Sequence, residues 1–96
     1  MHWCCLFIDS KQNYVFDPFG LPPDTRIIKQ IRKRNKNRIM SSTLQEQGID
    51  ESSCGQRCMV LLNKLFNASE ADRPEVFYKH CTTKKDINKL WKKLGL

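Results

Sequence analysis

The sequence predicts an α+β fold in which a small mixed sheet, containing a β-hairpin, packs against helices. A continuous apolar run over residues 3–8 and a β-favouring segment over residues 14–16 flank the polar stretch 9–13, which is typical of a hairpin. Farther along the chain, apolar residues recur at helical spacing. The 96 residues form at most one domain with a modest core.

The strand predictions rest on composition and on proline. The run over residues 3–8 has no polar position, which predicts a central strand covered on both faces. Adjacent Cys4 and Cys5 would point to opposite faces of this strand, which suits buried thiols. Pro18 lacks a backbone donor, so the second strand is expected to end before it. Residues 38–44 favour a third, short strand.

Three helices are predicted. The first helix has a capping residue at its start, Asp24 or Thr25, and an apolar face of Ile27, Ile28 and Ile31. It is expected to end at Asn35 or Asn37. The second opens at Cys54 and has a wide apolar stripe of Cys58, Met59, Leu61, Leu62, Leu65 and Phe66. A polar linker and Pro74 precede the last, amphipathic helix, which carries Ile87, Leu90, Trp91 and Leu94 and stops at Gly95.

The net charge of +7 is concentrated in two stretches. Residues 26–38 contain seven basic residues and no acidic one, and the tail after residue 78 contains six lysines. Such stripes attract polyanions, above all nucleic acid. The alternative is a solvated basic face without a partner. The DNA-binding candidates are Arg32, Lys33, Arg34 and Lys36.

The location of the protein is predicted from what the sequence lacks. No stretch approaches the roughly 18 apolar residues that a membrane span needs, so no membrane partner is expected. No basic segment precedes the first apolar run, as a secretory signal would require. The five cysteines are therefore expected to be reduced thiols in an intracellular, monomeric protein.

Cys54 is the candidate nucleophile of a thiol protease. Such an enzyme requires a thiolate, a base, a group that orients the base and donors for the oxyanion. Cys54 lies at a predicted helix start, where the helix dipole favours a thiolate. Gly55 follows it and leaves room for a substrate backbone.

The other three groups lie elsewhere in the sequence. His2 precedes the first strand and Asp17 follows the second, so a hairpin would bring both to its open end. There the carboxylate would fix the tautomer of the imidazole and stabilise its charged form. Gln47 lies seven residues before Cys54. Its side-chain amide could donate to the oxyanion together with the backbone amide of Cys54.

Each of these residues has a simpler interpretation when it is taken alone. A histidine near a chain terminus is usually polar surface, and an aspartate before a proline is usually a turn residue. A cysteine at a helix start is more often structural than catalytic. It is their order and their local sequence that favour catalysis.

This order and local sequence resemble the adenovirus protease (adenain) family. The resemblance covers residues 2–20 and 47–62 well and the remainder only loosely. SUMO-deconjugating proteases share the order of the four residues but match the segment around Asp17 less closely. The matching motifs are His2-Trp3 before an apolar strand, the segment Tyr14 to Gly20 with the sequence YVFDPFG, and Gln47-Gly48 followed at the family's spacing by Cys54-Gly55.

The resemblance implies a partial papain-like or adenain-like protease fold. It implies Cys54 as nucleophile, His2 as general base, Asp17 as orienting acid and Gln47 as oxyanion donor. Trp3 would shield the ion pair from water. The implied substrates are viral precursor polypeptides, or those of virus-like transposons, and the implied location is the host nucleus or the virion. Adenain is stimulated by DNA and by a viral peptide attached through a disulfide. No cysteine lies between residues 6 and 53 to pair with such a peptide, so no cofactor is expected, and stimulation by DNA stays open.

The family also has a substantial segment before its catalytic histidine, whereas here the histidine is residue 2. The sequence is therefore expected to represent a truncated protease domain. Because chain termini fray, a base at this position is expected to be poorly held, and the 96 residues alone could be inactive.

Three other functions stay open. One is a non-enzymatic, basic module that binds nucleic acid, and another is a protease that removes SUMO-like or ubiquitin-like proteins. The third is a zinc site, in which the first two ligands are spaced one residue more widely than in the usual C-x-x-C knuckle. Its ligands would be Cys54, Cys58, His80 and Cys81, whereas the preferred interpretation assigns no metal.

Overall fold

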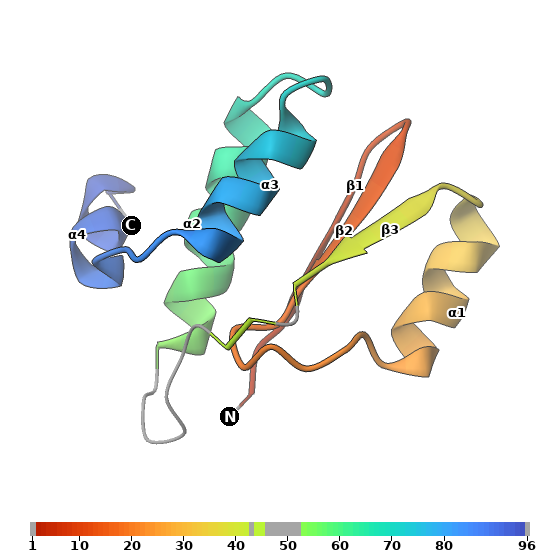
Figure 1. The fold of residues 1–96 in the computed structure, drawn as a ribbon, viewed down its shortest axis with the longest axis horizontal. Coiled ribbons are helices and arrows are strands. Elements are labelled where there is room, and N and C mark those ends of the chain that lie inside the picture. The colour runs from red at the N-terminus through yellow and green to blue at the C-terminus, as the bar shows by residue number, and fades with distance from the viewer. Residues whose placement is uncertain (1, 43, 46–52, 96) are drawn as a thin grey trace.

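The structure is a computed structural model that describes residues 2–42, 44–45 and 53–95 (Figure 1). Within these ranges α2 and α3 lie on one side of a small sheet, α1 lies on the other, and α4 packs against α2 (Figure 1). The α+β class and the mixed sheet are confirmed. The elements in order are β1 (Cys5–Ile8), β2 (Gln12–Phe16), α1 (Thr25–Arg34), β3 (Arg38–Ser41), α2 (Cys54–Asn67), α3 (Arg73–Thr82) and α4 (Ile87–Lys93).

The sheet has the strand order β1-β2-β3. β1 and β2 form the predicted antiparallel hairpin, with Cys5 opposite Phe16. β3 runs parallel to β2, because α1 carries the chain back along the sheet. Within the described ranges β1 is therefore an edge strand, and the prediction of a central strand covered on both faces is wrong. Leu6 is 39% exposed, whereas four of the five residues of β2 are buried.

β2 is held on both of its faces. Successive side chains of a strand point to opposite faces, so Asn13 and Val15 face away from the main core. The side-chain amide of Asn13 donates to the side-chain oxygen of Asn35, which ends α1, and Ile31 of α1 is fully buried. This packing fixes the strand that leads into Asp17. The core on the opposite face consists of Tyr14, Phe16, Cys58, Leu61, Leu65 and Phe77.

Two helix starts agree with the sequence. α1 begins after Asp24, whose carboxylate accepts a hydrogen bond from the backbone N–H of Arg26. α2 begins at Cys54. Its apolar stripe is narrower than predicted, because Met59 and Phe66 are 43% and 74% exposed.

α3 is a helix that the sequence analysis did not predict. Pro74 lies in its first turn, where a proline is favoured because the backbone there needs no N–H donor. Phe77 and His80 are its buried residues. None of the helices in the described ranges is long and apolar enough to cross a membrane.

Arg73, the first residue of α3, fastens the helices to the hairpin. Its guanidinium lies 3.3 Å from the carboxylate of Asp9 in the hairpin turn and 4.8 Å from the centre of the Phe7 ring. It also donates to the carbonyl of Leu65 in α2 at 2.8 Å. One side chain thus connects β1, α2 and α3.

Candidate active site

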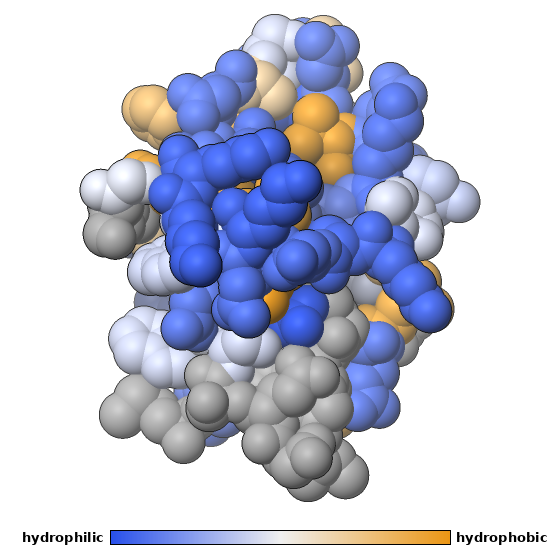
Figure 2. All heavy atoms as spheres, turned by 90° about the vertical axis from the view of Figure 1, so that its left-hand side faces the viewer, coloured by the Kyte–Doolittle hydropathy of each residue, from blue (hydrophilic) through white to orange (hydrophobic). Residues whose placement is uncertain are grey.

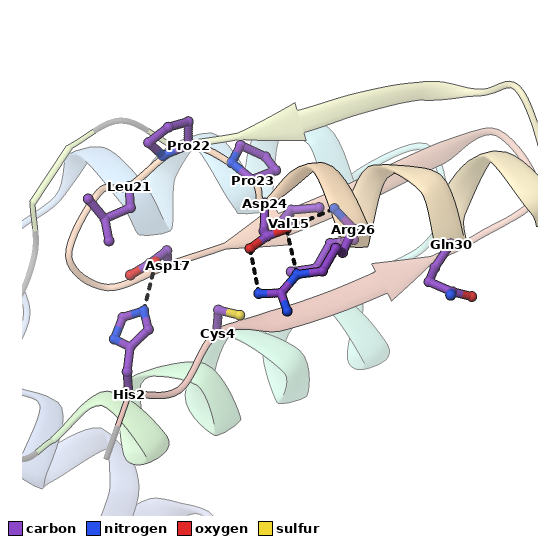
Figure 3. Close-up of a pocket in the computed structure, with 11 residues that line it drawn as sticks. His2, Cys4, Val15, Asp17, Leu21, Pro22, Pro23, Asp24, Arg26 and Gln30 are labelled. Atoms are coloured by element: carbon purple, nitrogen blue, oxygen red, sulfur yellow. Dashed lines mark hydrogen bonds and ion pairs between the residues drawn. The ribbon is translucent and has the colours of Figure 1, made fainter.

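The hairpin brings His2 and Asp17 together at one end of the sheet. His2 Nε2 lies 2.8 Å from Asp17 Oδ2, and Figure 3 shows the two side chains facing each other. When Nε2 donates its proton to the carboxylate, Nδ1 carries the lone pair of the neutral ring. Nδ1 is then the nitrogen that can accept a proton from a thiol.

A turn after β2 orients the carboxylate of Asp17. The N–H of Gly20 donates to the carbonyl of Asp17 at 2.8 Å, and Asp, Pro and Gly occupy positions that a type I turn favours. The N–H of Phe19 donates to Asp17 Oδ1, also at 2.8 Å. Gly20 has a φ of 74°, a conformation that other residues adopt only with strain. Each carboxylate oxygen therefore has its own donor.

The aromatic ring beside the ion pair belongs to Phe19. Its centroid lies 5.0 Å from that of the His2 imidazole, with 30° between the planes. The side chain of Asp17 is 12% exposed and that of His2 is 42% exposed. Phe19 belongs to the YVFDPFG motif, but the motif alone does not indicate this contact, and the residue expected as the shield is Trp3.

Trp3 contacts the first turn of α2. A Cβ atom on Gly55 would stand 3.8 Å from Cδ1 of the Trp3 indole, so the ring borders the space predicted for a substrate backbone. The thiol of Cys58 donates to the carbonyl of Trp3 at 3.7 Å. These contacts hold the segment that carries His2 against the helix that begins with Cys54.

Cys54 is the first residue of α2 and is buried, with 3% of its surface exposed. Two other thiols, those of Cys4 and Cys5, lie just before and at the start of β1. A hydrogen bond with Cys58 and burial raise the pKa of Cys5, while partial burial and the charge of Asp17 raise the pKa of Cys4. Both stay protonated near neutral pH and cannot serve as the nucleophilic thiolate. Cys4 is exposed, contrary to the expectation of buried thiols.

Gln47 lies outside the described residues, and its role stays a prediction. The ends of the segment that contains it are described. Ser41 ends β3 beside Val15, near Asp17, and α2 begins at the same end of the molecule (Figure 1). Ser41 and the start of α2, which flank Gln47 in the sequence, thus lie at the same end of the molecule.

An open groove of about 620 Å³ borders the ion pair on the α1 side of the sheet (Figure 3). At its rim, the guanidinium of Arg26 lies 3.0 Å from the carboxylate of Asp24, and this contact lowers the pKa of Asp24 to about 2. The groove offers apolar surface next to the imidazole. Its apolar lining comes from Cys4, Val15, Leu21, Pro22, Pro23 and Ile27.

The predicted DNA-binding residues lie at the opposite end of the sheet. Arg38 starts β3 beside Gln12, at the end away from Asp17. Basic residues at the end of α1 also face the negative pole of the helix dipole, which stabilises the helix itself. All four candidates are exposed, and they are Arg32, Lys33, Arg34 and Lys36.

His80, a ligand in the zinc alternative, is buried in the core. Lys64 Nζ lies 3.3 Å from His80 Nδ1, and the ring meets the edge of Phe16 with centroids 5.4 Å apart. Burial, together with the charges of Lys85 and Lys64, lowers the pKa of His80 to about 3. Across the described residues, no group of three or more His, Cys, Asp or Glu side chains is arranged to hold a metal ion.

Comparison with known proteins adds no relative. No family model, no curated protein and no solved structure matches the chain. The resemblance to adenovirus proteases therefore rests on the sequence motifs, and it stays a prediction.

Proposed function

We propose that this chain belongs to a cysteine endopeptidase of the adenovirus-protease type. The observation that carries the proposal is the contact between His2 Nε2 and Asp17 Oδ2, on a segment that Trp3 joins to Gly55. Base, acid and candidate nucleophile thus lie on neighbouring segments at one end of the sheet.

In the proposed reaction, the thiol of Cys54 gives its proton to His2 Nδ1, and the thiolate attacks the carbonyl carbon of the peptide bond. Asp17 stabilises the imidazolium. Backbone N–H groups at the start of α2, with Gln47, stabilise the oxyanion. The imidazolium returns the proton to the leaving amine, and water then hydrolyses the thioester. The proposed substrates are precursor polypeptides of a virus or a virus-like transposon.

A peptide-derived electrophile that traps nucleophilic cysteines tests this proposal. The full chain should be labelled at Cys54, and Cys54→Ala should abolish the labelling, as read by mass spectrometry of the tryptic peptides. Cys4→Ala is the matched control and should keep the label, because Cys4 is an exposed thiol of raised pKa. Labelling that survives Cys54→Ala would exclude the assignment.

The same assay can be run with conjugated substrates. Electrophiles carried on the C-terminus of a SUMO-like or ubiquitin-like protein would label Cys54 faster than peptide electrophiles if the chain were a deconjugating protease. Faster labelling by the peptide electrophile is expected here, because the segment from Tyr14 to Gly20 resembles the adenovirus type more closely.

A second proposed function is binding to the nucleic-acid backbone by the basic end of α1. Its basis is the exposed cluster at and after the last turn of that helix. Replacing Arg32, Lys33 and Lys36 with glutamine should weaken DNA binding and flatten its salt dependence, by about one unit of slope per lost phosphate contact. The control replaces the same charge on α4, at Lys89, Lys92 and Lys93. Equal losses of DNA affinity in both variants would show that the net charge of the chain, and not the cluster on α1, accounts for the binding.

A further inference from the structure

Two cysteines from distant parts of the sequence meet between β1 and α2. Cys5 begins β1, and Cys58 lies one turn into α2, 53 residues later. Cys5 and Phe7 both pack against the core cluster that contains Cys58, as expected for alternate residues of one strand. Cys58 is 3% exposed and Cys5 is half-buried. The two thiols therefore belong to the contact between the sheet and the helices.

Each of the two side chains lies against the backbone of the other segment. Cys5 Sγ lies 3.9 Å from the carbonyl oxygen of Cys58, and Cys58 Sγ lies 3.7 Å from the carbonyl oxygen of Trp3. Both sulfur atoms thus occupy the space between the two backbones. The hydrogen bond between the thiols, which together with burial raises the pKa of Cys5, agrees with this placement. A disulfide needs side chains that already lie side by side, because its Cβ atoms stand about 3.5–4.5 Å apart.

A groove of about 430 Å³ leads from the surface to the two thiols. It runs between the start of β1 and α2 and reaches Trp91 of α4. Cys5 and Cys58 line it, whereas none of its described lining residues is charged. On the face of the molecule that includes α4, hydrophilic residues surround small apolar patches (Figure 2). A small, water-soluble reagent can therefore approach the groove from this side.

From this arrangement we propose that Cys5 and Cys58 are a redox-sensitive pair, which closes a disulfide between β1 and α2 when a small aliphatic disulfide oxidises it. Cys5, the more exposed of the two, reacts first. Its thiolate attacks one sulfur of the oxidant, so that a mixed disulfide forms and one small thiol leaves. The thiolate of Cys58 then attacks the Cys5 sulfur, and the second small thiol leaves. The two cysteines lose two protons and two electrons, and the oxidant gains both.

The bond fastens the segment that carries His2 to the helix that begins with Cys54. Cys5 lies three residues after His2, and Cys58 lies four residues after Cys54. In the reduced form noncovalent contacts alone hold residues 2–5 on α2, whereas the closed form holds them covalently. The bond does not depend on the proposed protease function, so its test is carried out on a chain without Cys54.

The test treats the full chain carrying Cys54→Ala with hydroxyethyl disulfide. The reaction is run at mildly alkaline pH, because the raised pKa of Cys5 keeps its thiol protonated near neutral pH. The product should lose two hydrogen atoms in mass, and tryptic digestion without reduction should yield peptide 1–11 joined to peptide 58–64. Closure should raise the midpoint of thermal unfolding by about 10 °C. It should also slow the hydrogen exchange of the backbone amides of residues 3–5.

Cys4→Ala is the matched control, because Cys4 is the neighbouring, exposed thiol. This variant should keep the bond between the same two peptides. It also assigns the bond to Cys5, since peptide 1–11 contains both cysteines. Cys81→Ala should keep the bond as well, although Cys81 packs against the same core cluster.

Two further variants remove the partners themselves. Cys58→Ala empties a core position, so Cys5→Ala, at the half-buried partner, is the second variant, and neither should close a bond. Loss of closure in Cys4→Ala, a bond between Cys4 and Cys5, or disulfide-linked dimers would overturn the proposal. So would a mixed disulfide on Cys5 that persists while Cys58 is present, or an unfolding midpoint that closure leaves unchanged.

Discussion

His2 Nε2 lies 2.8 Å from Asp17 Oδ2, while the other oxygen of the same carboxylate accepts the N–H of Phe19. The carboxylate is therefore oriented by its own turn and not by distant packing. Because Nε2 faces the acid, Nδ1 of His2 is the atom that must face the thiol in the proposed reaction. The geometry thus assigns different tasks to the two ring nitrogens.

Asp17→Asn should uncouple the base from its acid without disturbing the turn. The asparagine oxygen can still accept the Phe19 N–H, but the side chain no longer stabilises an imidazolium. We expect labelling of Cys54 to slow by a factor of about 10² to 10⁴. Nitrogen-15 NMR of the ring should show the Nε2–H tautomer in the wild type. A wild-type ring protonated on Nδ1, or an unchanged labelling rate, would contradict this account.

Gly20→Ala should strain the turn that holds Asp17. Its φ of 74° lies in the left-handed region, where a Cβ costs about 1–2 kcal/mol. We expect a loss of about that size in the free energy of unfolding, measured with urea, and slower labelling of Cys54. Gly95→Ala is the control, since Gly95 also has a positive φ, of 70°, but lies at the end of α4. It should lose stability without slowing the labelling.

The ion pair between Arg73 and Asp9 should contribute more to stability than an exposed pair. Their side chains are 16% and 4% exposed, and removing one partner leaves the other charge largely buried. Arg73→Met or Asp9→Asn should each cost about 2–4 kcal/mol. A double-mutant cycle on urea unfolding should give a coupling above about 1 kcal/mol.

The control for this cycle is the pair of Lys79 and Glu75 on α3, with side chains 70% and 69% exposed. Its coupling should be about 0.5 kcal/mol or less, because solvent screens it. A coupling free energy between Arg73 and Asp9 no larger than that of the exposed pair would show that this ion pair between the hairpin and α3 does not contribute more to stability than an exposed pair.

His80 should make the domain less stable as the pH falls. Its pKa is lowered from 6.5 to about 3 in the fold, so between these values the unfolded chain binds the extra proton. The free energy of unfolding therefore decreases from pH 6.5 downward, by about 1.4 kcal/mol per pH unit at most. Urea unfolding between about pH 6.5 and 5 avoids carboxylates with lowered pKa values, such as Asp9, because these titrate at more acidic pH. His80→Gln should flatten the slope, and an equal slope would refute the buried, neutral histidine.

Local patterns in the sequence predicted the local parts of the fold. The hairpin follows from apolar strands around a polar turn, and its register brings His2 to Asp17 without information from the rest of the chain. The start of α1 follows from Asp24 as a capping residue. The start of α2 at Cys54 follows from the apolar positions behind it.

The errors concern neighbours that are distant in sequence. An apolar run such as β1 reports hydrophobicity but not how many strands lie beside it, so the sequence favours a central strand where the described structure has an edge strand. α3 has only two buried residues, and the proline in its first turn, Pro74, is in the sequence alone as typical of a linker as of a helix start. The contact of Trp3 with Gly55 joins segments over fifty residues apart, and no local pattern reports it.

The most direct test of the central claim is the rate of alkylation of Cys54 by a small reagent at about pH 6, in the wild type and in His2→Gln. If His2 takes the proton of Cys54, the wild type should react at least about tenfold faster than the variant, because only the wild type has a base that removes this proton. Equal rates in the two proteins would show that His2 and Cys54 do not act together, and would contradict the proposed protease site.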